Sequence, residues 1–322
     1  MHLKTLFIIL ALLFAVELFY LRLANFFNIA DKPNLRSSHY NLTIRGGGII
    51  FTIAAIVFFI FFDFQYPFFI FGLILISLIS FLDDILTLSS KLRLIIQVLS
   101  VCLLFTQWGL WGSSYVSLII GLFIVIGTIN AYNFMDGING ITGAYSLVTL
   151  VTLIYVNLEI VKFISMDFLM TIVLSLIVFN FFNFRVKAKC FAGDVGSVGI
   201  AFILMFVIGM LILRTGNFLY LLFLLMYGLD VITTITFRFL SGEKIYEAHR
   251  RHFYQYLVNE QKFSHLKVAI SYAIIQLCFN FLIISSELKS LISGIIVTFV
   301  AFSFFILIRI LSQGKNIIKR VH

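Results

Sequence analysis

The chain has 322 residues, of which 61% are hydrophobic and 11% charged, and its formal net charge is +9. A soluble domain has roughly a quarter charged residues and about half apolar ones. A mean hydropathy of +1.10 therefore excludes a soluble globular protein. The sequence predicts an all-α fold, a polytopic bundle of transmembrane helices, with residues 1–322 forming one integral membrane domain.

Apolar segments long enough to cross a bilayer recur along the whole chain. A spanning helix needs about 20 mainly apolar residues, which gives about eleven spans. The first could be a cleaved signal peptide, but it is long for one and no small-residue cleavage site follows, so we interpret it as a helix. The predicted centres lie near Leu12, Val57, Leu75, Leu99, Phe123, Val151, Val173, Met205, Leu225, Ile275 and Val300.

The loop after the first span is basic and ends in a glycine run. It contains the sequence DKPNLR at 31–36, then His39, then Arg45 followed by three glycines. Cations beside a Gly-rich entry to a helix suit contact with a lipid phosphate or a nucleotide donor. A plain cytoplasmic loop is the alternative.

Two adjacent carboxylates, Asp83 and Asp84, directly follow the third span, with Lys91 and Arg93 close behind. Carboxylates at a membrane boundary are costly unless they are paired or bind a metal. A turn there could aim both at a hard cation such as Mg²⁺, which prefers oxygen ligands. The alternative is a polar helix end with both acids in water.

The fifth span ends in the sequence NAYNFMDGINGITG. Asn130, Asn133 and Asp136 recur every third residue, which places them on one broad helix side. The glycines that follow allow close approach of backbone to a ligand, so the segment suits a nucleotide or a sugar. Helix packing through small residues is the alternative.

The sequence FAGDVGS opens the eighth span and places Asp194 at a helix N-terminus. Backbone N–H groups at such an end favour phosphate, and Asp194 could hold a metal that bridges phosphates. Capping of the helix by Asp194 or Ser197 is the alternative.

A further polar segment, AHRRHFYQ, contains His249, Arg250 and His252. Imidazole and guanidinium groups can bind phosphate oxygens. A zinc site is not indicated, because a third ligand is missing nearby and the three scattered cysteines form no pair. An ordinary basic loop with incidental histidines is the alternative.

Two acids, Glu17 and Asp230, lie within predicted spans. Intramembrane acids mark functional sites by default. For Asp230, an internal Asp–Arg pair near Arg238 is an equal alternative.

The basic residues predict the orientation of the chain. If the N-terminus is external, 19 of the 23 Lys and Arg residues fall on one side, which is then cytoplasmic. The C-terminus is then cytoplasmic as well. The positive charge reflects orientation and anionic lipids, so nucleic acid is not an expected partner. The acids of the motifs share the cytoplasmic side: Asp31, Asp83, Asp84, Asp136 and Asp194.

These motifs, in this order from about residue 31 to about residue 265, resemble the bacterial polyprenyl-phosphate N-acetylhexosamine-1-phosphate transferases of glycosyltransferase family 4. The AHRRHFYQ form is similar to the branch that initiates O-antigen or capsular polysaccharide. The resemblance implies that Asp194 is a Mg²⁺ ligand (with Mn²⁺ as a substitute), and that Asp83 and Asp84 line the metal and acceptor site. All three would be catalytic residues and metal ligands. It implies that the remaining site residues bind substrate: Arg45, Lys91, Arg93, Asn133, Asp136, His249, Arg250 and His252.

The implied reaction joins undecaprenyl phosphate to the sugar phosphate of a UDP-N-acetylaminosugar and releases UMP, on the cytoplasmic face of the bacterial inner membrane. Asp83 would position or deprotonate the acceptor, or bind metal. Direct attack and a covalent phospho-enzyme both remain open, as do the sugar, the polymer and the oligomeric state, a homodimer included. A transporter is the alternative from another class, but its acids would lie near the bilayer midplane.

Overall fold

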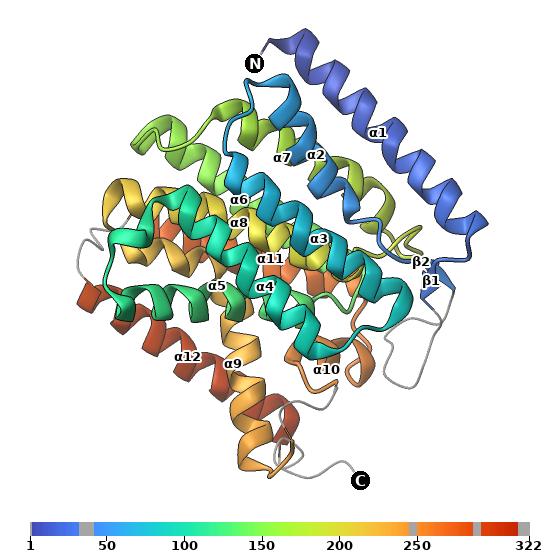
Figure 1. Ribbon diagram of the computed structural model, residues 1–322. Coiled ribbons are helices and arrows are strands. Elements are labelled where there is room, and N and C mark those ends of the chain that lie inside the picture. The colour runs from blue at the N-terminus through green and yellow to red at the C-terminus, as the bar shows by residue number, and fades with distance from the viewer. Residues whose placement is uncertain (1, 32–41, 245–249, 286–290, 315–322) are drawn as a thin grey trace.

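The computed structural model describes residues 2–31, 42–244, 250–285 and 291–314. This part of the chain is almost entirely helical (Figure 1). The α-helices are α1 (Leu3–Phe26), α2 (Ile49–Phe61), α3 (Pro67–Leu86), α4 (Ser90–Trp108), α5 (Tyr115–Met135), α6 (Ile141–Tyr155), α7 (Met166–Asn183), α8 (Gly193–Thr215), α9 (Leu225–Leu240), α10 (Phe253–Asn259), α11 (His265–Ser285) and α12 (Leu291–Gln313). The shorter elements are β1 (Ala30–Asp31), β2 (Thr43–Ile44), the 3₁₀ turns η1 (Leu110–Gly112) and η3 (Phe218–Leu224), and the π-helical turn η2 (Val156–Ile160).

The predicted all-α membrane bundle is confirmed. Each of the eleven predicted centres lies in a different helix, and ten helical segments in the described residues are long and apolar enough to cross a membrane. The remaining one, α2, has only 13 residues. At 1.5 Å per residue it is about 20 Å long, which is shorter than the hydrocarbon core of a bilayer.

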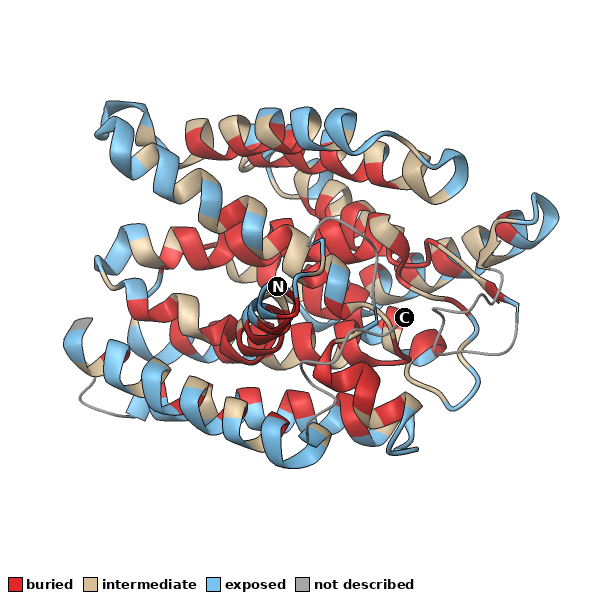
Figure 2. Ribbon diagram, turned by 90° about the horizontal axis from the view of Figure 1, so that it is seen from below, coloured by how far each residue is buried: buried red, intermediate tan, exposed pale blue. Residues whose placement is uncertain are grey.

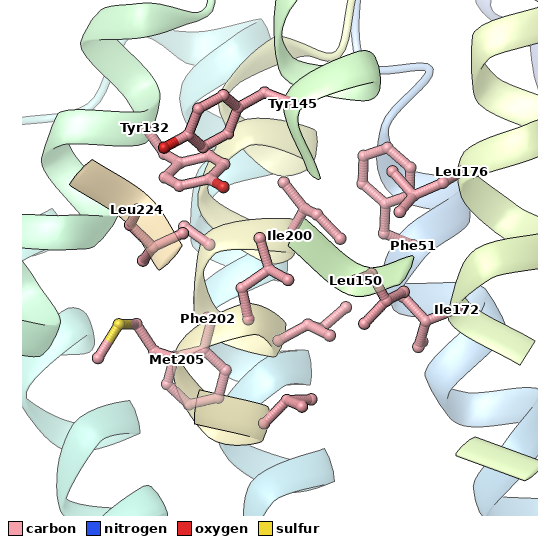
Figure 3. Close-up of a cluster of buried hydrophobic side chains, with 14 of the residues drawn as sticks. Phe51, Tyr132, Tyr145, Leu150, Ile172, Leu176, Ile200, Phe202, Met205 and Leu224 are labelled. Carbon is pink, nitrogen blue, oxygen red and sulfur yellow. The ribbon is translucent and has the colours of Figure 1, made fainter. Parts of the chain in front are cut away.

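Helix α8 is the central helix of the bundle. In its most apolar window 94% of the residues are buried, against 17% in α1 and α5. Figure 2 shows the same contrast, with buried residues on the inner helices and exposed ones on the outer helices. Figure 3 shows α8 side chains such as Ile200 and Phe202 packed among those of Leu150 and Phe51, from α6 and α2. Since α8 contacts so many neighbours, its N-terminus has a fixed place in the bundle.

Two glycines let α2 begin close to α8. A Cβ atom added to Gly48 would lie 2.3 Å from the Cα of Gly196, and one added to Gly196 would lie 2.6 Å from the Cα of Gly48. A Cβ atom cannot lie so close to another carbon, so both positions require glycine. The contact places the loop that contains Arg45 beside the first turn of α8.

A candidate active site at one end of the bundle

A polar cavity of about 200 Å³ lies where several helix ends meet. A second cavity, of about 660 Å³, shares Asn139, Phe191 and His265 with the first. The residues that line the smaller cavity come from the loop before α2, the end of α5, the start of α8 and the segments around α10 and α11. They are Asp31, Arg45, Asn133, Asp136, Gly137, Ile138, Asn139, Asn183, Phe191, Gly193, Asp194, Gln255 and His265.

The N-terminus of α8 is held by a carboxylate from α3. Both oxygens of Asp84 accept backbone hydrogen bonds from α8, from the N–H of Asp194 at 2.9 Å and from that of Val195 at 3.1 Å. The turn before them uses Gly193 at φ +71°, where a Cβ would lie 2.5 Å from Asp84 Oδ2. Asp84 is therefore the cap of α8, a role that the motif alone suggests for Asp194 or Ser197.

Two arginines join three of the motif acids, Asp83, Asp84 and Asp194, into one cluster. Arg45 Nε lies 2.6 Å from Asp84 Oδ1, and Arg45 Nη2 lies 3.0 Å from Asp194 Oδ1. Arg93 Nη1 lies 2.7 Å from Asp83 Oδ2 and 3.5 Å from Asp194 Oδ2. Burial opposes the charge of Arg45, but the carboxylates of Asp84 and Asp194 outweigh it and raise the pKa of the guanidinium. Both arginines remain about one third exposed, so they can also meet an anionic substrate.

Asn133 and Asp136 form another part of the cavity wall. Asn133 Oδ1 accepts a hydrogen bond from Ser197 Oγ on α8 at 2.9 Å. Asp136 accepts one from Thr142 Oγ1 at 2.6 Å. Burial raises the pKa of the Asp136 carboxyl to about 6, with a further contribution from the negative charge of Asp194. The first hydrogen bond fixes α5 against α8, so this wall and the acidic cluster keep their relative position.

The acids fit a metal ion that takes part of its coordination from a substrate. In the described residues no three His, Cys, Asp or Glu side chains are grouped as a metal cage. Mg²⁺ commonly binds through one or two carboxylates, with water and substrate phosphates as its other ligands. Asp83 and Asp194 both contact the single cationic nitrogen of Arg93, so one positive ion can reach both. Asp84 fits less well, because both of its oxygens accept backbone N–H groups.

Several predicted residues lie away from the lining of this cavity. Lys91 is exposed at the start of α4, and Arg250 is exposed before α10. Asn130 donates to Gln97 Oε1 at 3.3 Å, away from the neighbouring Asn133. His249 falls outside the described residues, as do residues 32–41 with the basic loop.

His252 and the intramembrane acid Asp230 face each other. His252 is 2% exposed, and its Nδ1 lies 3.3 Å from Asp230 Oδ1. The Asp–Arg alternative named Arg238, but that residue pairs with Glu243 at 3.1 Å. The arginine beside Asp230 is instead Arg309 of α12, at 3.9 Å. The sequence did not indicate this pairing, because about 80 residues separate Asp230 from Arg309.

Nine residues of the cavity lining were not among the predicted site residues: Asp31, Gly137, Ile138, Asn139, Asn183, Phe191, Gly193, Gln255 and His265. Asn183 connects two loops, since it accepts from the Gly140 N–H at 2.8 Å and donates to the Cys190 carbonyl at 2.8 Å. His265 Nδ1 accepts from the Asn139 N–H at 3.3 Å. The sequence does contain a signal for Asn183 and His265. An amide or imidazole at the very end of an apolar span is costly in lipid unless it has a hydrogen-bond partner.

Comparison with known families decides the class. Residues 66–212 match the model described as glycosyl transferase family 4. This part of the chain belongs to that family. A comparison with curated proteins found no match. The family predicted from the motifs is thus confirmed, and it indicates a membrane-bound transferase that moves a sugar phosphate onto a polyprenyl phosphate.

The glycosyl transferase family 4 segment runs from the start of α3 into α8, so it contains Asp83, Asp84, Asn133, Asp136 and Asp194. The cavity also needs residues on either side of this segment. Arg45 precedes it, and Gln255 and His265 follow it. The site is therefore built by the family segment together with the chain before and after it.

Proposed function

We propose that the protein transfers an N-acetylaminosugar 1-phosphate from a UDP-sugar to undecaprenyl phosphate, giving undecaprenyl-diphospho-sugar and UMP. One observation carries the proposal. Asp194 lies at the N-terminus of a buried helix, between two arginines, and lines a cavity together with Asn133 and Asp136. Such a site combines cations for phosphates with amide and carboxylate groups for a nucleotide sugar.

In the proposed reaction an oxygen of the lipid phosphate attacks the sugar-side phosphorus of the donor. The bond from that phosphorus to the oxygen bridging to UMP breaks, and the sugar C1–O bond is kept. Phosphoryl transfers depend mainly on positioning and charge neutralisation. Arg45 and Arg93 supply fixed positive charge beside the reacting phosphates, and Asn133 and Asp136 orient the nucleotide sugar.

Asp83 is proposed to orient Arg93. Its Oδ1 accepts the Leu88 N–H at 2.6 Å and its Oδ2 contacts Arg93 at 2.7 Å, so neither oxygen is free to act as a base. Only Oδ2, which meets a side chain and not a backbone N–H, could exchange its partner for a metal ion. A phosphate monoester has a second pKa of about 6 and is largely a dianion at neutral pH, so a strong base is not required. Asp194 and Asp83 would hold Mg²⁺, or Mn²⁺ in its place, which when bound neutralises charge on the phosphates.

The cellular setting is part of the same proposal. We place the site on the cytoplasmic face of a bacterial inner membrane, where the product would begin a cell-surface polysaccharide. The alternative of a transporter loses support from the position of the cavity, since the described acids of the motifs gather at helix ends and not midway along the bundle.

The test is release of UMP by purified protein in detergent, given undecaprenyl phosphate, Mg²⁺ and a panel of UDP-N-acetylaminosugars. Asp194→Asn should abolish release, and EDTA should do the same. Asp63→Asn is the matched control, because Asp63 is exposed and has a left-handed backbone that Asn tolerates. Lipid-dependent UMP from one donor supports the proposal. Full activity in Asp194→Asn would contradict the role of Asp194, and no release by folded protein from any donor would contradict the reaction.

A further inference from the structure

The segment 250–255 forms part of the cavity wall without belonging to a long helix. Gln255 lines the cavity. Tyr254 is fully buried, and its hydroxyl donates to the carbonyl of Phe134 at 2.9 Å. The same hydroxyl lies against Gly137, where a Cβ atom would come within 2.2 Å of it. The position of this segment therefore determines the shape of the cavity beside Asp136.

The buried carboxylate of Asp230 holds the segment by its backbone. Asp230 is fully buried in α9, and its two oxygens accept the N–H groups of Phe253 at 2.9 Å and Tyr254 at 3.1 Å. Oδ2 also accepts the hydroxyl of Tyr272 from α11 at 2.6 Å. His252 Nδ1, which belongs to the same segment, is the fourth group in contact with this carboxylate. A carboxylate with this many donors fixes the first turn of α10 in one place.

Arg309 holds the same segment from the last helix. It is 1% exposed in α12, which runs beside α9 in Figure 1. Its Nη2 donates to the carbonyl of Arg251 at 2.9 Å. Its Nη1 donates to the hydroxyls of Thr233 at 2.7 Å and Thr234 at 2.8 Å. Thr234 in turn donates to Asp230 Oδ1 at 3.1 Å, so it connects the two charges across the 3.9 Å between them.

We propose that Asp230 and Arg309 are positioning residues for donor binding, which hold segment 250–255 in the form that completes the cavity wall. The proposal rests on the proposed function. Neither side chain lines the cavity, so each acts through the segment. A buried ion pair is a poor source of stability compared with packed apolar side chains. Three hydrogen bonds of this pair, in contrast, go to the backbone of residues 251–254, which favours a role in positioning that segment.

Arg309→Met tests the proposal, because it removes the guanidinium group and keeps an unbranched apolar side chain. A displacement of about 1 Å in a binding wall can cost about 10²-fold. We expect the KM for the UDP-sugar to rise about 10- to 100-fold, with the KM for undecaprenyl phosphate unchanged. We also expect the amides of Phe253 and Tyr254 to exchange hydrogen faster.

Gln276→Met is the matched control. Gln276 is equally buried in α11, and it bonds Tyr145 and the Met226 N–H, away from segment 250–255. The Gln276→Met protein should be less stable but keep the wild-type KM values for the UDP-sugar and for undecaprenyl phosphate. Thr234→Val is a milder variant, for use if Arg309→Met does not fold, and it should raise the donor KM by a smaller factor in the same direction.

Two results would overturn the inference. One is a folded Arg309→Met or Thr234→Val protein with an unchanged donor KM and unchanged amide exchange at Phe253. The other is an equal rise of the donor KM in Gln276→Met, which would mean that any buried polar loss has the same effect. Failure of the proposed function is distinguishable, since it would appear as wild-type protein that releases no UMP while amide exchange still responds to Arg309→Met.

Discussion

Burial changes the acid–base chemistry of one cavity carboxylate, Asp136. It lies just beyond the end of α5, partly buried, with its Oδ1 accepting from Thr142. Its pKa is raised to about 6, chiefly because burial disfavours the charged form. The carboxylate, which in the proposed function would accept hydrogen bonds from hydroxyl groups of the bound sugar or ribose, therefore predominates above about pH 6 and is lost as the pH falls through that value.

Donor affinity should follow this titration. We expect the Kd of the UDP-sugar, measured without lipid acceptor, to rise about tenfold for each pH unit below about pH 6. Omitting the acceptor matters, because its own phosphate titrates near the same pH. Asp136→Asn should give a weaker Kd that lacks the transition near pH 6, and Asp63→Asn should follow the wild type. A wild-type Kd that stays constant from pH 5 to pH 8 would contradict this prediction.

Residue types were visible in the sequence, but the partner of each residue was not. Asp83 and Asp84 are identical and adjacent, yet one contacts Arg93 and the other caps a helix more than 100 residues away. The motif predicted two carboxylates near one site, and the structure brings them there together with Asp194. Which oxygen meets which donor depends on how α3 packs against α8, and no local pattern encodes that.

At the level of elements, the junction of α2 with α8 depends on two missing Cβ atoms. Gly196→Ala would place a methyl group 2.6 Å from the Cα of Gly48, so the two backbones would have to separate. Overpacking of this kind costs about 1–3 kcal/mol. We expect a lower thermal midpoint in detergent, together with loss of transfer because Arg45 moves away from Asp194.

Gly127→Ala is the control for that substitution. Gly127 is an exposed helical glycine in α5, and a Cβ there would meet nothing within 4 Å. It should leave the midpoint equal or slightly higher, since Ala is about 1 kcal/mol better than Gly within a helix. Equal midpoints for Gly196→Ala and Gly127→Ala would show that the α2–α8 contact is looser than described.

The capping of α8 by Asp84 can be tested by its effect on stability. Asp84→Asn keeps the size of the side chain but replaces one acceptor oxygen with a donor, facing the N–H of Asp194 or Val195. An unsatisfied buried group costs about 1–3 kcal/mol. Asp194→Asn loses only contacts with partly exposed arginines. We therefore expect the thermal midpoint to fall more for Asp84→Asn than for Asp194→Asn. Equal shifts would contradict the capping role of Asp84.

The elements themselves were predictable from hydropathy, because length and apolar composition define a span. The short helix α2 was the exception. Its 13 residues were counted as a full span, since the apolar sequence continues past Phe61. The structure ends the helix there, and Asp63, Phe64 and Tyr66 take left-handed backbone conformations. Such a turn depends on packing around Tyr66, whose hydroxyl accepts the Ser165 N–H at 3.1 Å, and this contact is non-local.

At the level of the whole molecule, the orientation of the bundle in the membrane decides which solutes reach the cavity. The ends of α5 and α7 and the starts of α8 and α11 all contribute to one cavity, which is therefore open to one side of the bundle. The distribution of Lys and Arg predicts that this side is cytoplasmic. In the proposed setting the nucleotide sugar is made in the cytoplasm. The proposed function therefore requires that the cavity opens to the cytoplasmic side.

Cysteine labelling tests this orientation. Ser113 and Val186 are both exposed, the first between α4 and α5 and the second between α7 and α8, next to Lys187. With eleven crossings and an external N-terminus, Ser113→Cys should react with a membrane-impermeant maleimide on intact spheroplasts, and Val186→Cys should react only after lysis. The parent protein, with its three native cysteines, gives the background. The reverse pattern would place the cavity outside the cell. Equal labelling of both positions on intact spheroplasts would contradict the three crossings, by α5, α6 and α7, that separate them.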